Sequence, residues 1–255
     1  MTTIPSWSAV AVSGLLVLVA IGIASWQRLG ISRDLAIAAV RALVQLVAVG
    51  AVLAWLFANA GLLGALVWII VMALIAAGES RRRGRGIPRA YLIALLGITA
   101  GTSTTLGVLV LGGVVPTEPQ VIIPIGGMVV SGAMQAASLT LASLRRSAVE
   151  NRPAVEAALS LGLPARVAFA REARTAVRTA LIPTVDQTRV VGLISLPGTM
   201  TGLIIAGVDP LDAIRYQIIV MYMLLAAWAV SARVTARAAE RVRFDDAERL
   251  VLVAV

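Results

Sequence analysis

The strongest constraint in this sequence is a series of long apolar stretches with few charged residues. They lie near residues 7–26, 36–57, 61–78, 90–114, 120–144, 190–207 and 211–232. A bilayer core about 30 Å thick needs roughly 20 helical residues for each crossing, so each stretch predicts a membrane-spanning helix. The apolar share of 59% and the mean hydropathy of +0.93 exclude an ordinary soluble globule. The expected fold class is an all-α polytopic membrane protein with about seven transmembrane helices, forming a single transmembrane domain over residues 1–255.

The arginines predict how these helices are oriented. The alternating gaps 28–33, 81–89, 145–189 and 233–249 hold two, five, eight and five of the 22 basic residues. The positive-inside rule therefore places the N-terminus outside and the C-terminus inside. The net charge of +9 then follows from topology and not from nucleic-acid binding, which would also need aromatic side chains, here only 4%.

The residue types that are missing exclude several function classes. The chain contains no cysteine, no histidine and no lysine. Without lysine it cannot form the phosphate-binding GxxxxGK[ST] loop, so we expect no ATP hydrolysis by that route. An intramembrane enzyme would need paired carboxylates, histidines or a Ser/Lys dyad deep in the bundle, and the sequence offers none of these. We therefore expect that this chain is not an enzyme. We also expect that it binds no cofactor. A metal here could meet only oxygen or thioether ligands.

The inner loop 145–189 is much longer than the other connections, and the sequence predicts two helices in it. Asn151 and Pro153 can open the first, which Gly162 ends, and Pro164 can open a second that runs to about residue 181. The second helix carries arginines 171, 174 and 178 on one stripe. We expect it to lie along the anionic inner membrane surface.

Three polar or polarisable residues, Met128, Ser131 and Gln135, share one stripe of the predicted span 120–144. An amide within a membrane must find partners or line a wet cavity, which makes Gln135 a candidate for the substrate pathway. The serine can instead bond its own backbone, and the methionine is either apolar packing or part of a path for soft cations.

The predicted span 190–207 contains Pro197, Gly198 and Met200. A broken membrane helix has free carbonyl oxygens, which transporters use to bind substrate, so these residues are candidates for the substrate pathway. The carbonyl oxygens would be hard ligands and the Met200 sulfur a soft ligand, all within one turn. The alternative is a packing kink beside Gly198.

Two charged residues are further pathway candidates. Arg41 and Gln45 lie on one stripe of the predicted span 36–57. The Arg41 side chain either faces the bundle interior or extends to the inner membrane interface. Because an arginine repels bare cations, Arg41 favours an anionic or chelated substrate or a structural role. Asp186 is expected just before the span 190–207, either as a solvated residue or helix N-cap, or as a gate.

The first loop helix carries Glu156, Ala157, Ala158 and Gly162, which spell EAAxxxG. This spacing resembles the cytoplasmic coupling motif of ABC-transporter permeases, in which a short helix docks into a separate ATPase. Small alanines allow close approach, the glutamate offers a charged contact, and the glycine permits a sharp turn. These residues are the expected ATPase-coupling site.

A longer block, 180–217, reads ALIPTVDQTRVVGLISLPGTMTGLIIAGVDPLDAIRYQ. It resembles the FetB-like (UPF0014-type) family of ABC-transporter permeases, iron or metal exporters related to plant aluminium-tolerance permeases. The block 123–128, IPIGGM, supports the resemblance. Thr199 departs from a family methionine, and Ser131-Gly132 replaces a Gly-Asn pair, so the substrate of this chain can differ.

The resemblance implies a permease subunit that exports iron, another metal or a metal-related solute from a bacterial cell through the plasma membrane. It also implies a homodimer in contact with membrane lipid, with ATP used by a separate P-loop ATPase subunit. The alternative is an ATP-independent channel or carrier for a small solute, which would not need the long inner loop.

The orientation can be tested by labelling, because the chain has no native cysteine. Cysteines replacing Thr3, Glu118 and Val255 are expected to react with an impermeant thiol reagent from outside at the first two positions only. Labelling of intact cells measures this, and reaction at position 255 would contradict the predicted orientation.

Overall fold

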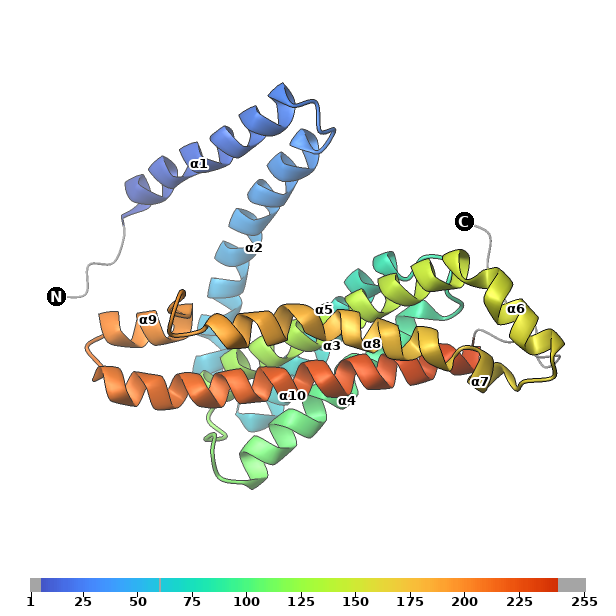
Figure 1. Cartoon of the computed structure of the whole chain (residues 1–255). Helices are drawn as coiled ribbons and strands as arrows, with labels where there is room; N and C mark the ends of the chain where they lie inside the picture. The colour runs from blue at the N-terminus through green and yellow to red at the C-terminus, as the bar shows by residue number, and fades with distance from the viewer. Residues whose placement is uncertain (1–5, 60, 243–255) are drawn as a thin grey trace. The chain divides into compact units, whose positions relative to one another are not determined.

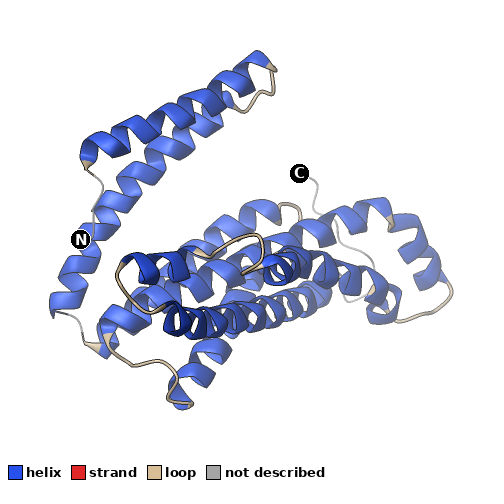
Figure 2. Ribbon diagram, turned by 60° about the vertical axis from the view of Figure 1, so that its left-hand side comes forward, coloured by secondary structure: helices blue, strands red, loops and turns tan. Residues whose placement is uncertain are grey.

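The computed structural model describes residues 6–59 and 61–242, and its elements are helices joined by loops and turns (Figure 2). The chain divides at residue 61 into two compact units, which are described separately. Two positions of the labelling experiment, Thr3 and Val255, lie outside the described residues, as does the end of the arginine-bearing C-terminal segment.

The first unit contains two helices, α1 (Trp7–Trp26) and α2 (Ser32–Asn59). The Ser6 hydroxyl accepts a hydrogen bond from the Ala9 amide and caps α1. The turn between the helices needs a left-handed backbone, which Gly30 provides with φ +72°. Both helices are long and apolar enough to cross a membrane, which agrees with the predicted spans 7–26 and 36–57.

The second unit is built around four long apolar helices. They are α3 (Leu62–Arg83), α4 (Ala90–Leu111), α5 (Pro119–Glu150) and α10 (Pro210–Val242). Helix α5 packs against α3, α4 and α10, and α10 also packs against α4 (Figure 1). Asp209 accepts a hydrogen bond from the Leu211 amide at 2.8 Å and caps α10. With α1 and α2, the described part of the chain therefore has six candidate membrane spans, and it belongs to a multi-pass membrane protein.

Small residues allow α4 and α10 to approach closely. A Cβ atom on Gly97 would overlap Thr235 Oγ1, and one on Gly101 would lie 2.7 Å from the Ala227 carbonyl oxygen. These glycines, four residues apart, face the same neighbour. Close backbone contact of this kind is how helices associate in lipid, where apolar burial gives little driving force.

Hydroxyl groups join the other helices across their interfaces. Ser231 on α10 donates a hydrogen bond of 2.8 Å to the carbonyl oxygen of Ala133 on α5. Ser138 on α5 donates to the hydroxyl of Ser80 on α3, which donates to the Met134 carbonyl. These three serine hydroxyls thus link α5 to α3 and α10, as is common between membrane helices, whereas the buried hydroxyls of Thr102, Thr105 and Thr235 have no hydrogen-bond partner.

The segment 145–189, expected to be a long loop, is helical, and its first predicted helix is confirmed. Helix α6 spans Arg152–Ser160, and Gly162 follows it with φ +80°. The second predicted helix is divided into α7 (Ala165–Ala168) and α8 (Ala170–Val190), so the predicted end near residue 181 is wrong. Helix α8 continues through Pro183, which leaves the carbonyl of Thr179 without its helical hydrogen bond.

One face of α8 packs inside the bundle. Ala173, Ala176 and Ala180 are buried, and the helix packs against α5 and α10. The face of α8 opposite its arginines therefore contacts protein helices, so α8 belongs to the bundle; that its arginine stripe lies at the anionic membrane surface stays a prediction.

The predicted transmembrane helix at 190–207 is wrong as well. Within this range the structure has the end of α8, a connection over residues 191–197, and the short helix α9 (Gly198–Ile205). Gly192 adopts φ +79°, and its amide donates to the Ser195 carbonyl oxygen, which forms a turn. An apolar stretch that contains a left-handed glycine and a proline five residues later cannot continue as one helix.

The close contact between α4 and α10 predicts a sharp difference between two glycines of α4. Gly101→Ala should lower the free energy of unfolding by about 1–3 kcal/mol, because the new methyl group meets a backbone carbonyl oxygen. Gly107→Ala is the matched control, since nothing lies within 4 Å of its Cβ position. Thermal unfolding of the purified full-length protein measures both, and equal midpoints would contradict the packing described.

Candidate functional site

A groove of about 510 Å³ lies between α5, α8 and α10. Its lining residues are Pro124, Gly127, Met128, Ser131, Gly132 and Gln135 from α5, Thr184 and Gln187 from α8, and Leu224 and Trp228 from α10. The structure thus brings together the three predicted pathway residues of α5. It adds residues from two further helices.

The lining of this groove mixes polar and apolar residues and contains no charged side chain. Ser131, Gln135 and Gln187 are exposed, so their oxygen and nitrogen atoms are available to a ligand. Met128 adds a thioether sulfur. Hydroxyl, amide and thioether groups can hold a cation without fixed negative charge or hydrogen-bond a polar solute.

The wall at Trp228 is fixed by a close contact with α5. A Cβ atom on Gly132 would lie 2.7 Å from the indole Nε1 of Trp228. Glycine at this position therefore lets the indole approach the α5 backbone, on the same wall as Ser131 and Gln135.

The predicted residues of the span 190–207 do not line this groove. Pro197 occupies the N-cap position of α9, and Gly198 and Met200 lie within α9, which packs against α10. The break in the helix is real, but it precedes Pro197 and comprises a connection of several residues. Of the described residues, no group of three or more acidic side chains could hold a metal ion.

The charged pathway candidates are in other places. Arg41 and Gln45 lie exposed on α2 of the first unit, and their pathway role stays a prediction. Asp186 lies inside α8 and pairs with Arg189 at 3.7 Å. The expectation that Asp186 caps the following helix is therefore wrong.

The predicted coupling residues lie on an exposed part of the chain. Glu156 pairs with Arg152 at 2.6 Å within α6, and Ala157 is exposed. Val155 is buried and anchors the helix. Leu161 directly follows the last residue of α6 and is 83% exposed. One side of α6 thus packs on the protein, while the other presents a glutamate, a small residue and an uncovered leucine.

Three further lining residues, Thr184, Gln187 and Trp228, are not predicted from the sequence. The two α8 residues are three positions apart and share a helix face. Both lie beyond residue 181, where this helix was expected to end. Trp228 lies within a correctly predicted apolar span, and no sequence pattern distinguishes it from lipid-facing aromatic residues.

Cysteine scanning can show whether the groove contains water. Cysteines at Ser131 and Gln135 should react with a water-soluble maleimide, because thiolate formation needs water. A cysteine at Leu96 is the control, since this leucine is exposed on the apolar α4 and is expected to face lipid. Labelling rates of the full-length protein in vesicles measure this. Equal rates at all three positions would show that the groove is not a distinct wet site.

Comparison with known proteins identifies the family. The chain is 36% identical over 244 residues to the "Probable iron export permease protein FetB" of Escherichia coli (strain K12), covering 96% of this chain and 94% of that protein. It is 41% identical over 215 residues to "UPF0014 membrane protein STAR2" of Oryza sativa subsp. japonica, covering 84% and 75%. It is 38% identical over 221 residues to "Protein ALUMINUM SENSITIVE 3" of Arabidopsis thaliana, covering 84% and 79%. No solved structure matches. The uncharacterised protein family UPF0014 matches residues 7–244, and this chain belongs to that family of membrane proteins.

Proposed function

We propose that this chain is the permease subunit of an ABC-type exporter, powered by a separate P-loop ATPase that docks on α6. The exported substrate is a metal cation such as iron, or a solute that carries a metal. The chain itself binds no cofactor, and the partner subunit uses the ATP.

The exposed side of α6 carries this proposal. A docking helix must present contact residues away from its own protein, and Glu156, Ala157 and Leu161 are exposed while Val155 is buried. Gly162 turns the chain sharply after the helix, with φ +80°. The helix thus stands at a corner of the inner loop, where a partner could reach it.

The uncharged groove supports a metal as the substrate. Ser131, Gln135 and Gln187 offer oxygen ligands, and Met128 offers sulfur. The relative from Escherichia coli is named a probable iron export permease. Of the two departures from the family pattern, Thr199 lies on α9 away from the groove, whereas Ser131 and Gly132 belong to its lining. The ligand set of this groove therefore differs from that of relatives with the Gly-Asn pair.

A homodimer in the plasma membrane completes the proposal. The groove is open on one side of a single chain, and a second copy related by twofold symmetry would close it. The pathway would then run between two copies, each with one ATPase. Nucleic acid has no part in this function.

Transport in vesicles tests the coupling role of α6. The full-length chain is reconstituted with a candidate P-loop ATPase subunit, and ATP-dependent movement of Fe²⁺ is measured. Glu156→Arg combined with Ala157→Trp should abolish transport and co-purification of the ATPase, because both changes obstruct the exposed side of α6. Loss of the exposed pair with Arg152 costs at most about 1 kcal/mol, so the fold should survive.

Glu150→Arg is the matched control, since Glu150 is exposed at the end of α5 and lies outside α6. It should transport as the parent does. Full activity of the α6 double variant would remove α6 as the docking site. Fe²⁺ movement by the parent without ATPase and ATP would instead favour the channel or carrier.

A further inference from the structure

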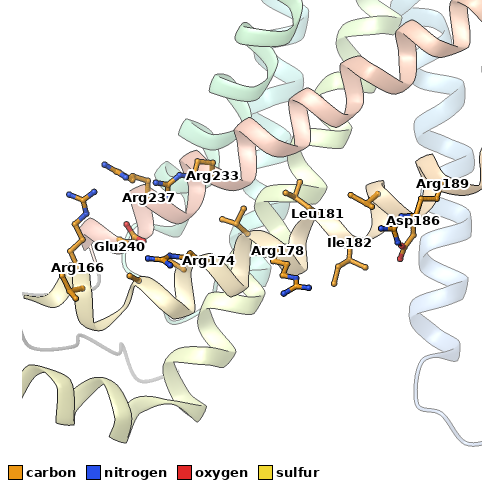
Figure 3. Close-up of a pocket in the computed structure, with 15 residues that line it drawn as sticks. Arg166, Arg174, Arg178, Leu181, Ile182, Asp186, Arg189, Arg233, Arg237 and Glu240 are labelled. Atoms are coloured by element: carbon orange, nitrogen blue, oxygen red, sulfur yellow. The ribbon is translucent and has the colours of Figure 1, made fainter. Parts of the chain in front are cut away.

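A second and larger groove, of about 950 Å³, lies between α7, α8 and α10, on another side of α8 from the candidate pathway. Figure 3 shows Arg166, Arg174, Arg233 and Arg237 around Glu240 at one end of it. Arginines from three different helices therefore converge on one place. The proposed transport function leaves this groove without a role.

The charges of this groove are not balanced within the described chain. Six arginines line it, against two carboxylates. Asp186 is already paired with Arg189 at the far end. No ion pair to the remaining arginines is formed by any described residue, and Glu240 is the one other carboxylate in the lining. Gathering like charges is unfavourable, so an anion bound among them would be strongly stabilised.

The middle of the groove is mostly apolar, although Arg178 also lies there (Figure 3). Val177, Leu181, Ile182 and Val185 of α8 line it, and Ile182 and Val185 are partly open to the surroundings. The groove therefore combines a cationic end with an apolar slot along the same helix. This combination matches a molecule that has an anionic head and a hydrocarbon tail.

The position of the groove along α10 matches the same molecule. No charged residue lies between Arg215 and Arg233, so the apolar part of α10 ends where the arginine cluster begins. Leu181 packs at the level of Trp228 and Ala232, within that apolar part. The arginines are thus at the expected height of lipid headgroups, and the apolar slot is at the height of acyl chains.

We propose that this groove binds an anionic phospholipid, with the phosphate held by Arg174, Arg233 and Arg237 and an acyl chain along Leu181 and Ile182. The planar guanidinium groups suit phosphate oxygens, to which they donate paired hydrogen bonds. A small soluble phosphate compound would fill the cationic end but leave the apolar slot uncovered. The lipid accounts for both halves of the groove.

Native mass spectrometry of the full-length protein in detergent tests this proposal. Phosphatidylglycerol and phosphatidylcholine with the same acyl chains are compared, and the parent should bind phosphatidylglycerol about tenfold more tightly. Arg174→Gln with Arg237→Gln should remove this preference. The control is Arg145→Gln with Arg146→Gln, which removes equal charge from exposed residues of α5 outside the groove, and it should keep the preference.

A variant that keeps the positive charge separates the loss of the guanidinium groups from misfolding of the protein. Arg174→Lys with Arg237→Lys should bind phosphatidylglycerol with intermediate affinity, because lysine retains the charge but lacks the paired donors. Glycerol 3-phosphate and inorganic phosphate should not displace the lipid at equal concentration.

Three results would overturn the proposal. The first is equal binding of both lipids by the parent, and the second is equal loss in the groove and control pairs. The third is displacement by glycerol 3-phosphate, which would show a site for soluble phosphate compounds. None of these measurements depends on transport or on an ATPase, so failure here leaves the proposed function untouched.

Discussion

The close approach of α10 to its neighbours is the contact on which the second unit depends. Gly101 lets the α10 backbone reach α4, and Gly132 lets the Trp228 indole reach α5. Ser231 then donates its hydrogen bond to the Ala133 carbonyl oxygen. In lipid, where apolar side chains gain little by leaving the solvent, backbone proximity and such hydrogen bonds hold helices together. Both grooves have α10 as a wall, so both inherit their shape from these contacts.

Helix α8 separates the chemistry of the two grooves. Thr184 and Gln187, three residues apart, line the groove shared with α5, whereas Arg174, Arg178 and Leu181 line the other. Because a helix presents different faces at these spacings, the cationic residues of α8 are kept away from the uncharged groove. A cation in the uncharged groove therefore meets neutral ligands in its own lining, although α8 is rich in arginine.

Apolar stretches in the sequence predicted all six candidate membrane helices of the described residues, because lipid leaves few alternatives to a helix. Helices α5 and α10 extend beyond the predicted ends at residues 144 and 232, to Glu150 and Val242. For the stretch 190–207 the same reasoning wrongly predicted one membrane-spanning helix. Its hydropathy is high, but Gly192 takes a left-handed conformation, and Pro197 starts a new helix. Hydropathy measures where a segment can lie, whereas backbone conformation decides whether it stays helical.

The part of the groove lining that lies on one helix was predicted from the sequence. The part that α8 contributes was not, because it depends on how the helices pack. Met128, Ser131 and Gln135 share a stripe that helical spacing makes visible. The contribution of α8 depends on its passage through Pro183, which the buried faces of Ala176 and Ala180 stabilise against α5 and α10. Burial against two helices offsets the lost hydrogen bond, and such tertiary stabilisation leaves no mark in the local sequence.

The continuity of α8 also links the two parts of the proposed function. Helix α7 contacts both α6 and α8, so the chain from the docking helix to the groove is helical with only short interruptions (Figure 1). Thr184 follows Pro183 directly, at the point where α8 lacks one backbone hydrogen bond. A displacement of α6 by a bound ATPase would therefore reach the groove through α8, and the helix would bend most easily beside a residue that lines the groove.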